Sequence, residues 1–111
     1  QLRQQMGIRA IVDDALLMIG ELYVKKSDYA SATAVFRDIV HRSSGDQQVK
    51  AWAYIKWGEA LMHLGMFDNA TRVFQEFAIQ MPNSYLVDIA RSHIDTIKWG
   101  RQNRSEIKRL L

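Results

Sequence analysis

The chain has 111 residues and a formal net charge of +3, which is enough for one domain and not for two. It contains no cysteine, which excludes disulfide scaffolds, cysteine-based zinc sites and thiol catalysis. One proline and six glycines, with 48% hydrophobic residues, favour a helical globular domain over a strand-rich sandwich. No apolar run approaches the roughly 18 residues that would cross a bilayer.

The first predicted helix runs from residue 8 to about residue 25 and follows an N-terminal extension of residues 1–7. Asp13 and Asp14 lie early in it, where carboxylates suit the positive end of a helix. Its apolar residues recur at helical spacing and predict one buried face. This set consists of Ile11, Ala15, Leu16, Ile19, Leu22 and Tyr23.

A second predicted helix follows a break at residues 25–27 and is capped by Ser27 or Asp28. It ends before residues 43–45, where Gly45 permits the left-handed stop conformation. Its inward side is also apolar and holds Tyr29, Ala32, Phe36, Ile39 and Val40.

The third predicted helix is capped by Asp46 and stopped by Gly65. The fourth runs from about Phe67 to Gln80 and stops at residues 81–83, because proline disfavours helical backbone for the residue before it. The third carries Ala53, Tyr54, Trp57, Ala60, Leu61 and Leu64 as its stripe, and the fourth turns Ala70, Val73, Phe74 and Phe77 inward.

A fifth predicted helix, capped by Asn83 or Ser84, extends to about Gly100. Its apolar residues are Leu86, Ile89, Ala90, Ile94 and Ile97. Residues 102–111 form a basic tail with a short amphipathic pattern at Ile107, Leu110 and Leu111. This tail could be the start of a further helix, a frayed end, or a segment that docks in an acidic groove.

The chain repeats itself at the offset that separates Gly20 from Gly58, and small and aromatic residues lead the matches. Small side chains at matched points let two helix backbones approach, while aromatic rings fill the grooves beside the crossing. We therefore predict helix crossings at three matched pairs, with two complete units and a truncated third. The pairs are Gly20 with Gly58, Ala32 with Ala70, and Phe36 with Phe74.

The repeated pattern resembles the tetratricopeptide repeat. That pattern has a glycine in the first helix, a large residue three positions on, a glycine turn, an aromatic residue, an alanine, a phenylalanine four positions later and a closing proline. The second unit follows it at Gly58, Leu61, Gly65, Phe67, Ala70, Phe74 and Pro82, and the first at Gly20, Tyr23, Tyr29, Ala32 and Phe36.

The first unit departs from the family pattern, because Ser27 replaces the turn glycine and Ser44 stands where the proline would be. The offset from Gly20 to Gly58 is also longer than the usual repeat length of about 34 residues. The resemblance implies an all-α fold of about five helices, in which antiparallel hairpins stack as a right-handed solenoid. The units look like those of bacterial envelope proteins, namely outer-membrane assembly lipoproteins and accessory proteins of the Tol–Pal system.

The resemblance also implies a concave face, lined by the first helix of each hairpin, that binds a peptide or protein. Two acids, Glu21 and Glu59, suit a peptide with a basic residue and would repel the C-terminal carboxylate that some family members grip. Trp52 and Met62 are candidate anchors, although Trp52 could instead pack on a neighbouring helix. The implied groove residues are Leu17, Glu21, Val24, Trp52, Ile55, Glu59 and Met62, with Ser92 and Thr96 as candidates in the third unit.

No catalytic or cofactor motif stands out, so we expect a scaffold and not an enzyme, with no cofactor and no metal. Glu59 and His63 lie four positions apart on one predicted helix, and we interpret them as an ordinary helix pair. The alternative function is that the basic C-terminal tail binds nucleic acid or an anionic surface, which would show as a steep loss of binding with salt.

The sequence thus predicts repeat 1 at residues 8–44, repeat 2 at residues 45–82 and a capping helix or half repeat at residues 83–101. Stacked repeats usually need about three units for stability. We therefore expect either a longer solenoid or self-association through the open ends or the tail. The first residue is Gln1 and not methionine, which indicates a processed or excised piece, and a bacterial periplasm or envelope and a cytoplasm are both compatible with the chain.

Overall fold

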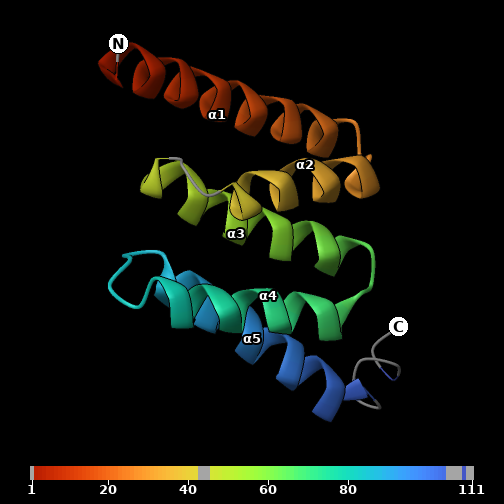
Figure 1. The fold of residues 1–111 in the computed structure, drawn as a ribbon. Coiled ribbons are helices and arrows are strands. Elements are labelled where there is room, and N and C mark those ends of the chain that lie inside the picture. The colour runs from red at the N-terminus through yellow and green to blue at the C-terminus, as the bar shows by residue number, and fades with distance from the viewer. Residues whose placement is uncertain (1, 43–45, 105–108, 110–111) are drawn as a thin grey trace.

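The structure, a computed structural model, describes residues 2–42, 46–104 and 109, and of residues 2–6 and 8–10 it describes the backbone alone. Within this described part the chain forms five α-helices and no strand. Successive helices run antiparallel and stack in chain order (Figure 1), which confirms the predicted all-α fold of stacked hairpins. The helices are α1 (Leu2–Lys25), α2 (Tyr29–His41), α3 (Gln47–His63), α4 (Phe67–Gln80) and α5 (Val87–Gln102).

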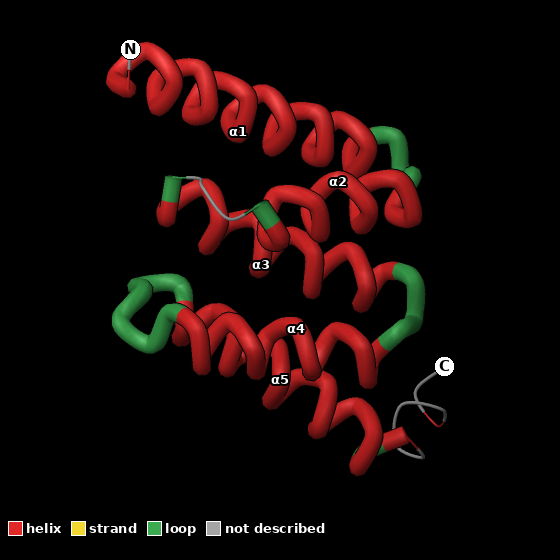
Figure 2. Tube along the Cα trace, in the orientation of Figure 1, coloured by secondary structure: helices red, strands yellow, loops and turns green. Residues whose placement is uncertain are grey.

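The connections alternate between the two ends of the stack, as Figure 2 shows. α1 packs on α2, α2 on α3, α3 on α4 and α4 on α5, and α1 also touches α3. Hence α1–α2 and α3–α4 are two hairpins, and α5 adds a single helix at the end of the stack. None of the described helices combines the length and the apolar character that a membrane crossing needs.

Two aspartates cap helices as predicted. The backbone N–H of Ser31 donates to Oδ1 of Asp28 at 3.2 Å, and the N–H of Gln48 donates to Oδ1 of Asp46 at 2.8 Å. Each carboxylate thereby satisfies an amide that the first helical turn leaves without a partner.

Two predicted helix starts were wrong. α1 begins at Leu2 and not at Ile8, so Asp13 and Asp14 lie in the middle of a helix and not at its positive end. α5 begins after Leu86, which offers no side-chain cap. The Ser84 hydroxyl instead accepts from the N–H of Leu86 at 3.2 Å and shapes the turn that precedes the helix. The predicted glycine stop at residues 43–45 and the apolar pattern of Ile107, Leu110 and Leu111 lie outside the described residues.

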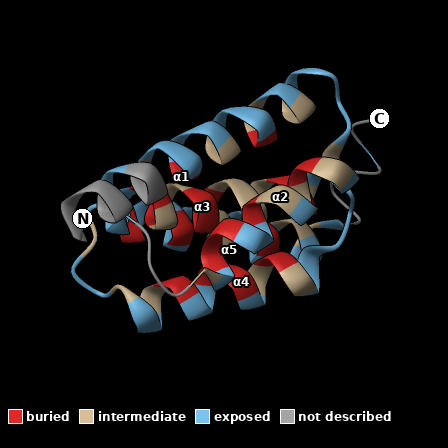
Figure 3. Cartoon of the chain, turned by 45° about the horizontal axis from the view of Figure 1, so that its top comes forward, coloured by how far each residue is buried: buried red, intermediate tan, exposed pale blue. Residues whose placement is uncertain are grey.

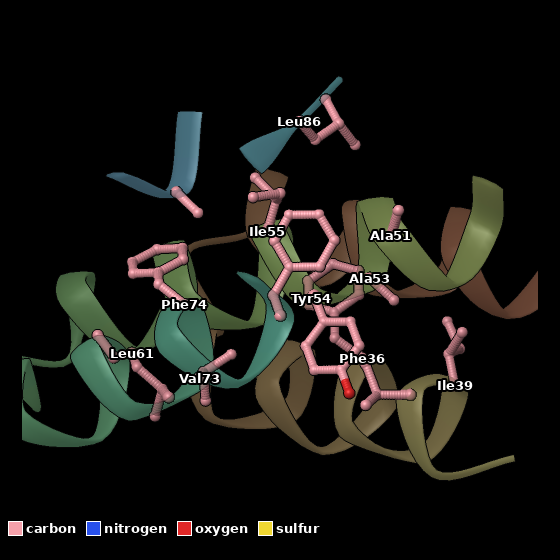
Figure 4. Packing of buried hydrophobic residues seen from close by; sticks show 14 of the residues in the cluster. Phe36, Ile39, Ala51, Ala53, Tyr54, Ile55, Leu61, Val73, Phe74 and Leu86 are labelled. Carbon is pink, nitrogen blue, oxygen red and sulfur yellow. The ribbon is translucent and has the colours of Figure 1, made fainter. Parts of the chain in front are cut away.

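The predicted crossings are confirmed at both glycines. A Cβ atom on Gly20 would lie 2.3 Å from the Phe36 ring, and one on Gly58 would lie 2.3 Å from the Phe74 ring. Real Cβ atoms do not come so close, so hydrogen alone fits between each helix and the ring of its partner helix. Ala32 and Ala70 are 0% exposed beside these contacts, and Figure 4 shows Phe36 and Phe74 within the same core cluster.

Several residues predicted to face inward lie at the surface. On α1, Ile11 is 69% exposed, Leu22 53% and Ile19 42%, because α1 ends the stack and packs against α2 and α3 on one side only (Figure 3). Leu16 and Tyr23 hold the packed side of α1 instead. The other predicted inward residues that are exposed are Ala15, Leu64 and Ile89.

Asp13 is a charged residue that is buried among the described residues, with 1% of its surface exposed. Its Oδ1 lies 3.2 Å from Nε of Arg42, an ion pair that is not aligned as a hydrogen bond. A carboxylate in such a place needs a cation beside it, because an isolated buried charge is very costly. The pair ties the middle of α1 to the end of α2.

Candidate functional site

The first helices of the repeats, α1, α3 and α5, lie along one side of the stack. α1 touches α3 directly, and α3 is joined to α5 by a contact between Glu59 and His93. Because residues one repeat apart hold the same place in successive helices, Glu21 and Glu59 belong to one row and Val24 and Met62 to another. All the predicted groove residues therefore come from this row of helices.

Most of these residues are half-buried, so part of each side chain stays accessible: Leu17, Glu21, Val24, Trp52, Glu59 and Met62. Ile55 differs, because it is 1% exposed and belongs to the hydrophobic core. We therefore remove Ile55 from the candidate groove. Ser92 and Thr96 are exposed on α5.

Trp52 packs at one end of this face, where its ring meets the edge of Tyr85 at a centroid distance of 6.5 Å. The ammonium group of Lys56 lies 5.9 Å from the same ring. Trp52 thus contacts the connection that leads into α5, which is the packing role left open by the sequence, while its half-buried ring keeps some accessible surface.

The centre of the candidate site is the pair Glu59 and His93. Oε2 of Glu59 and Nε2 of His93 are 2.9 Å apart, and the imidazole stacks on the Phe74 ring at 5.1 Å. His93 stands where the preceding unit has Ile55, one repeat earlier. The expected helix pair of Glu59 with His63 is not the contact that forms, since the His63 ring stacks on Tyr29 at 4.3 Å.

Two hollows adjoin this pair and share Met62 and Phe67. The first, of about 470 Å³, is lined by these two residues with Glu59, His63 and His93. The second, of about 550 Å³, is lined by the same two residues, by the part of α5 from Thr96 to Arg101, and by Arg104. Because Met62 and Phe67 line both, the two hollows are neighbours, and we call them together the α3–α5 groove.

The α3–α5 groove has two ends of different charge and an apolar middle. Glu59 and the two histidines lie at one end, and Arg101 and Arg104 lie at the other. Between them the rings of Phe67 and Trp99 are 42% and 55% exposed. Exposed aromatic rings beside charged groups are typical of surfaces that bind a peptide or protein.

Arg101 is held by a carboxylate of its own protein. Its Nη2 donates to Oδ1 of Asp68 at 2.5 Å. This hydrogen bond, reinforced by the guanidinium charge, holds the pKa of Asp68 below its usual range. The contact links the start of α4 to the end of α5 and fixes the wall of the second hollow.

The sequence did not predict His93, Phe67, Trp99 or Arg104 as groove residues. His93 could have been found from the repeat, because it lies one repeat after Ile55, a residue of the implied groove. Trp99 lies at the end of the predicted fifth helix and Arg104 in the basic tail, and their place beside Met62 depends on how α5 packs in the stack. The unit-one residues Leu17, Glu21 and Val24 lie on α1, away from the lining of both hollows.

The opposite side of the stack carries another hollow, between α2 and α4. It measures about 460 Å³ and includes Tyr54, Arg37 and Arg72 in its lining. Burial, with the charge of Glu76, raises the pKa of the Tyr54 hydroxyl, so this group is a neutral donor at neutral pH.

A comparison with protein families identifies the class. The model of the tetratricopeptide repeat matches residues 14–44 and 52–84, which is more than half of the chain. The chain therefore belongs to the tetratricopeptide repeat family, a family of non-enzymatic scaffolds that generally mediate protein–protein interactions. The matched segments fall on the α1–α2 and α3–α4 hairpins, and they begin at equivalent positions of the two units. No curated protein and no solved structure matches the chain.

Proposed function

We propose that this protein binds a peptide or a segment of another protein in its concave face, and that the α3–α5 groove is the main contact. The observation that carries the proposal is the pair of exposed rings, Phe67 and Trp99, lining one depression together with Met62. Covering water-exposed rings with an apolar side chain of the ligand removes apolar surface from water, which lowers the free energy of the complex. An apolar residue of the ligand therefore sits between these rings.

The charged end of the groove sets the second requirement on the ligand. Glu59 is partly exposed and has one carboxylate oxygen engaged with His93, which leaves its other oxygen able to accept from the ligand. Glu21 adds a second acid in the same row on α1. A basic residue near the apolar anchor fits these acids, and a free C-terminal carboxylate does not.

The test is peptide selection from a random display library on the immobilised full chain, followed by affinity measurement on variants. Trp99→Ala should weaken the selected peptides at least tenfold, about 1.4 kcal/mol, because an exposed anchor ring is lost. Ile79→Ala is the control, since Ile79 is also a large exposed apolar residue but lines neither hollow of the groove. The double variant Glu21→Lys/Glu59→Lys should remove the preference for basic peptides. Equal losses in Trp99→Ala and Ile79→Ala would count against the groove.

The basic tail remains a competing binding element for nucleic acid or an anionic surface. Arg101, which directly precedes the tail, adds little to it, because this arginine is already engaged by Asp68. Salt separates the two functions, since phosphate contacts predict a steep fall of affinity with ionic strength and burial of apolar groups predicts little change. The long repeat, measured from Gly20 to Gly58, supports a relation within the family to the bacterial envelope proteins named above.

A further inference from the structure

α1 carries a second apolar face, which points away from the rest of the molecule. At about 100° per residue, Ile11, Ala15, Met18 and Leu22 fall in one narrow stripe, opposite the buried positions Asp13 and Gly20. Ile11 is 69% exposed, Met18 63% and Leu22 53%, and Val12 and Ile19 widen the stripe on one flank. We call these residues together the α1 stripe.

The equivalent face of α3, one repeat later in the chain, is buried under a neighbouring helix. The residues of α3 that lie one repeat after Ile11, Ala15 and Leu22 are all buried, and α2 packs along α3. One direct contact of that packing is between the rings of His41 and Trp57, at 5.8 Å, and Trp57 is the counterpart of Ile19. In the described part of the chain, no helix packs over the corresponding side of α1 (Figure 3). In α3, the equivalent apolar face is covered by a neighbouring helix, so we expect the α1 stripe to be covered by a helix too.

The other end of the stack does not offer a matching surface. On α5, the exposed residues Asp88, Ser92 and Asp95 lie on the same side as Ile89 and Trp99, and Trp99 already belongs to the α3–α5 groove. A head-to-tail stack of copies would therefore bury the α1 stripe against carboxylates, and desolvating these charges costs free energy. Among the described helices, the surface that matches the α1 stripe best is the α1 stripe itself.

We propose that two copies of this protein pair through α1 across a two-fold axis, with the α1 stripe of each copy facing the other. The alternating steps of four and three positions between Ile11, Ala15, Met18 and Leu22 are those of a two-helix seam, and the small Ala15 lets the two helices approach closely. A two-fold pairing uses the same patch on both copies and closes at the dimer.

The size of the α1 stripe sets the expected dissociation constant of the dimer. Exposed apolar patches of this kind measure on the order of 300–600 Å². Weak specific interfaces bury up to about 600 Å² per partner, so the dimer should dissociate in the micromolar range. The pairing leaves the α3–α5 groove open, because that groove is lined by α3, the start of α4, α5 and Arg104, and by no residue of α1.

Sedimentation equilibrium of the full chain tests the pairing up to about 100 µM, where a micromolar dimer is populated. The mass should rise from that of one chain toward that of two chains and stop there. Met18→Lys should raise the dissociation constant at least tenfold, and it installs the residue that α3 has at the equivalent position, Lys56, so the helix tolerates it. Ile79→Lys is the control, because Ile79 is 75% exposed on α4, away from the stripe.

Cross-linking supplies the second readout. The chain has no cysteine, so Met18→Cys and Ile79→Cys each carry a single thiol. A short bifunctional maleimide should join two copies of Met18→Cys and leave Ile79→Cys unjoined. A chain that stays monomeric at the highest concentration, a mass that keeps growing past the dimer, or equal behaviour of the two lysine variants would each overturn the proposal. A chain that stays monomeric would assign the α1 stripe to a different partner. A mass that grows past the dimer would assign it to an open-ended stack.

Discussion

Gly20 and Gly58 each face a phenylalanine ring so closely that a methyl group does not fit. Gly58→Ala should destabilise the protein by roughly 1–3 kcal/mol, because the added Cβ would lie 2.3 Å from the Phe74 ring. The ring has little room to move, since it is 0% exposed and stacked on His93. A urea melt followed by circular dichroism measures the loss.

Gly100→Ala is the control for this substitution. Among the described residues, no side chain or neighbouring helix lies within 4 Å of a Cβ placed on Gly100, so alanine should be neutral or stabilise α5 by up to about 1 kcal/mol. Ala70→Leu, at the 0% exposed alanine of the same unit, should cost a similar amount, roughly 1–3 kcal/mol, through overpacking. Unchanged melts for both Gly58→Ala and Ala70→Leu would remove the basis for the helix crossings.

Ser27 and Gly65 occupy the same turn in the two units and share a left-handed backbone. Ser27 has φ 60° and Gly65 has φ 76°. Because a side chain makes this conformation unfavourable by roughly 1–2 kcal/mol, Gly65→Ala should destabilise the protein by about 1 kcal/mol. Ser27→Gly should leave stability unchanged or raise it by a few tenths to about 1 kcal/mol, since relief of strain is partly offset by the freedom of glycine in the unfolded chain. Thermal melts of the two variants should therefore shift in opposite directions.

At the scale of the helix, the Asp46 cap fixes where α3 begins. Asp46→Ala should cost about 1 kcal/mol, because the N–H of Gln48 loses its acceptor at 2.8 Å. Asp46→Asn should retain most of the stability, since asparagine caps about as well as aspartate. Equal losses for the two variants in a urea melt would show that the charge of Asp46, and not its capping oxygen, matters.

The contact between Asp68 of α4 and Arg101 of α5 makes the folding stability of the protein depend on pH in the acidic range. The hydrogen bond from Arg101 lowers the pKa of Asp68 in the folded protein, so its stabilising effect is present above the unfolded pKa and is lost as pH falls through the folded one. Asp68 is exposed, so the effect on overall stability is small. In Arg101→Gln, the pKa of Asp68 measured by NMR should rise toward the ordinary value of about 3.9. An unchanged pKa would mean that the contact does not persist in solution.

The helices themselves were largely predictable from the sequence, because apolar spacing and turn residues mark them locally. Asp28 and Asp46 cap where expected. α1 was the exception, since its apolar residues cover two faces and spacing alone does not tell which face packs inward. Leu16 and Ile19 have equal hydrophobic character in the sequence, and their different burial depends on the position of α1 at the end of the stack.

At the scale of the whole molecule, the repeat that relates Gly20 to Gly58 predicted which residues share a row. It brought Glu59 and Met62 to the same side as their counterparts on α1, and both line the α3–α5 groove. It did not reveal His93, because the third unit replaces the aliphatic residue of this row with an imidazole. The contact between Glu59 and His93 joins two different helices, and no local pattern signals such a pair.

The central claim is that ligands bind along α3 and α5, and chemical-shift mapping tests it most directly. A peptide selected on the wild-type chain is titrated into the ¹⁵N-labelled protein, and the backbone amide shifts are followed. The account predicts that the largest changes fall around Met62, Phe67 and His93 and along α5 to Trp99. Changes that concentrate instead at Arg37 and Arg72, beside the hollow between α2 and α4, would contradict it.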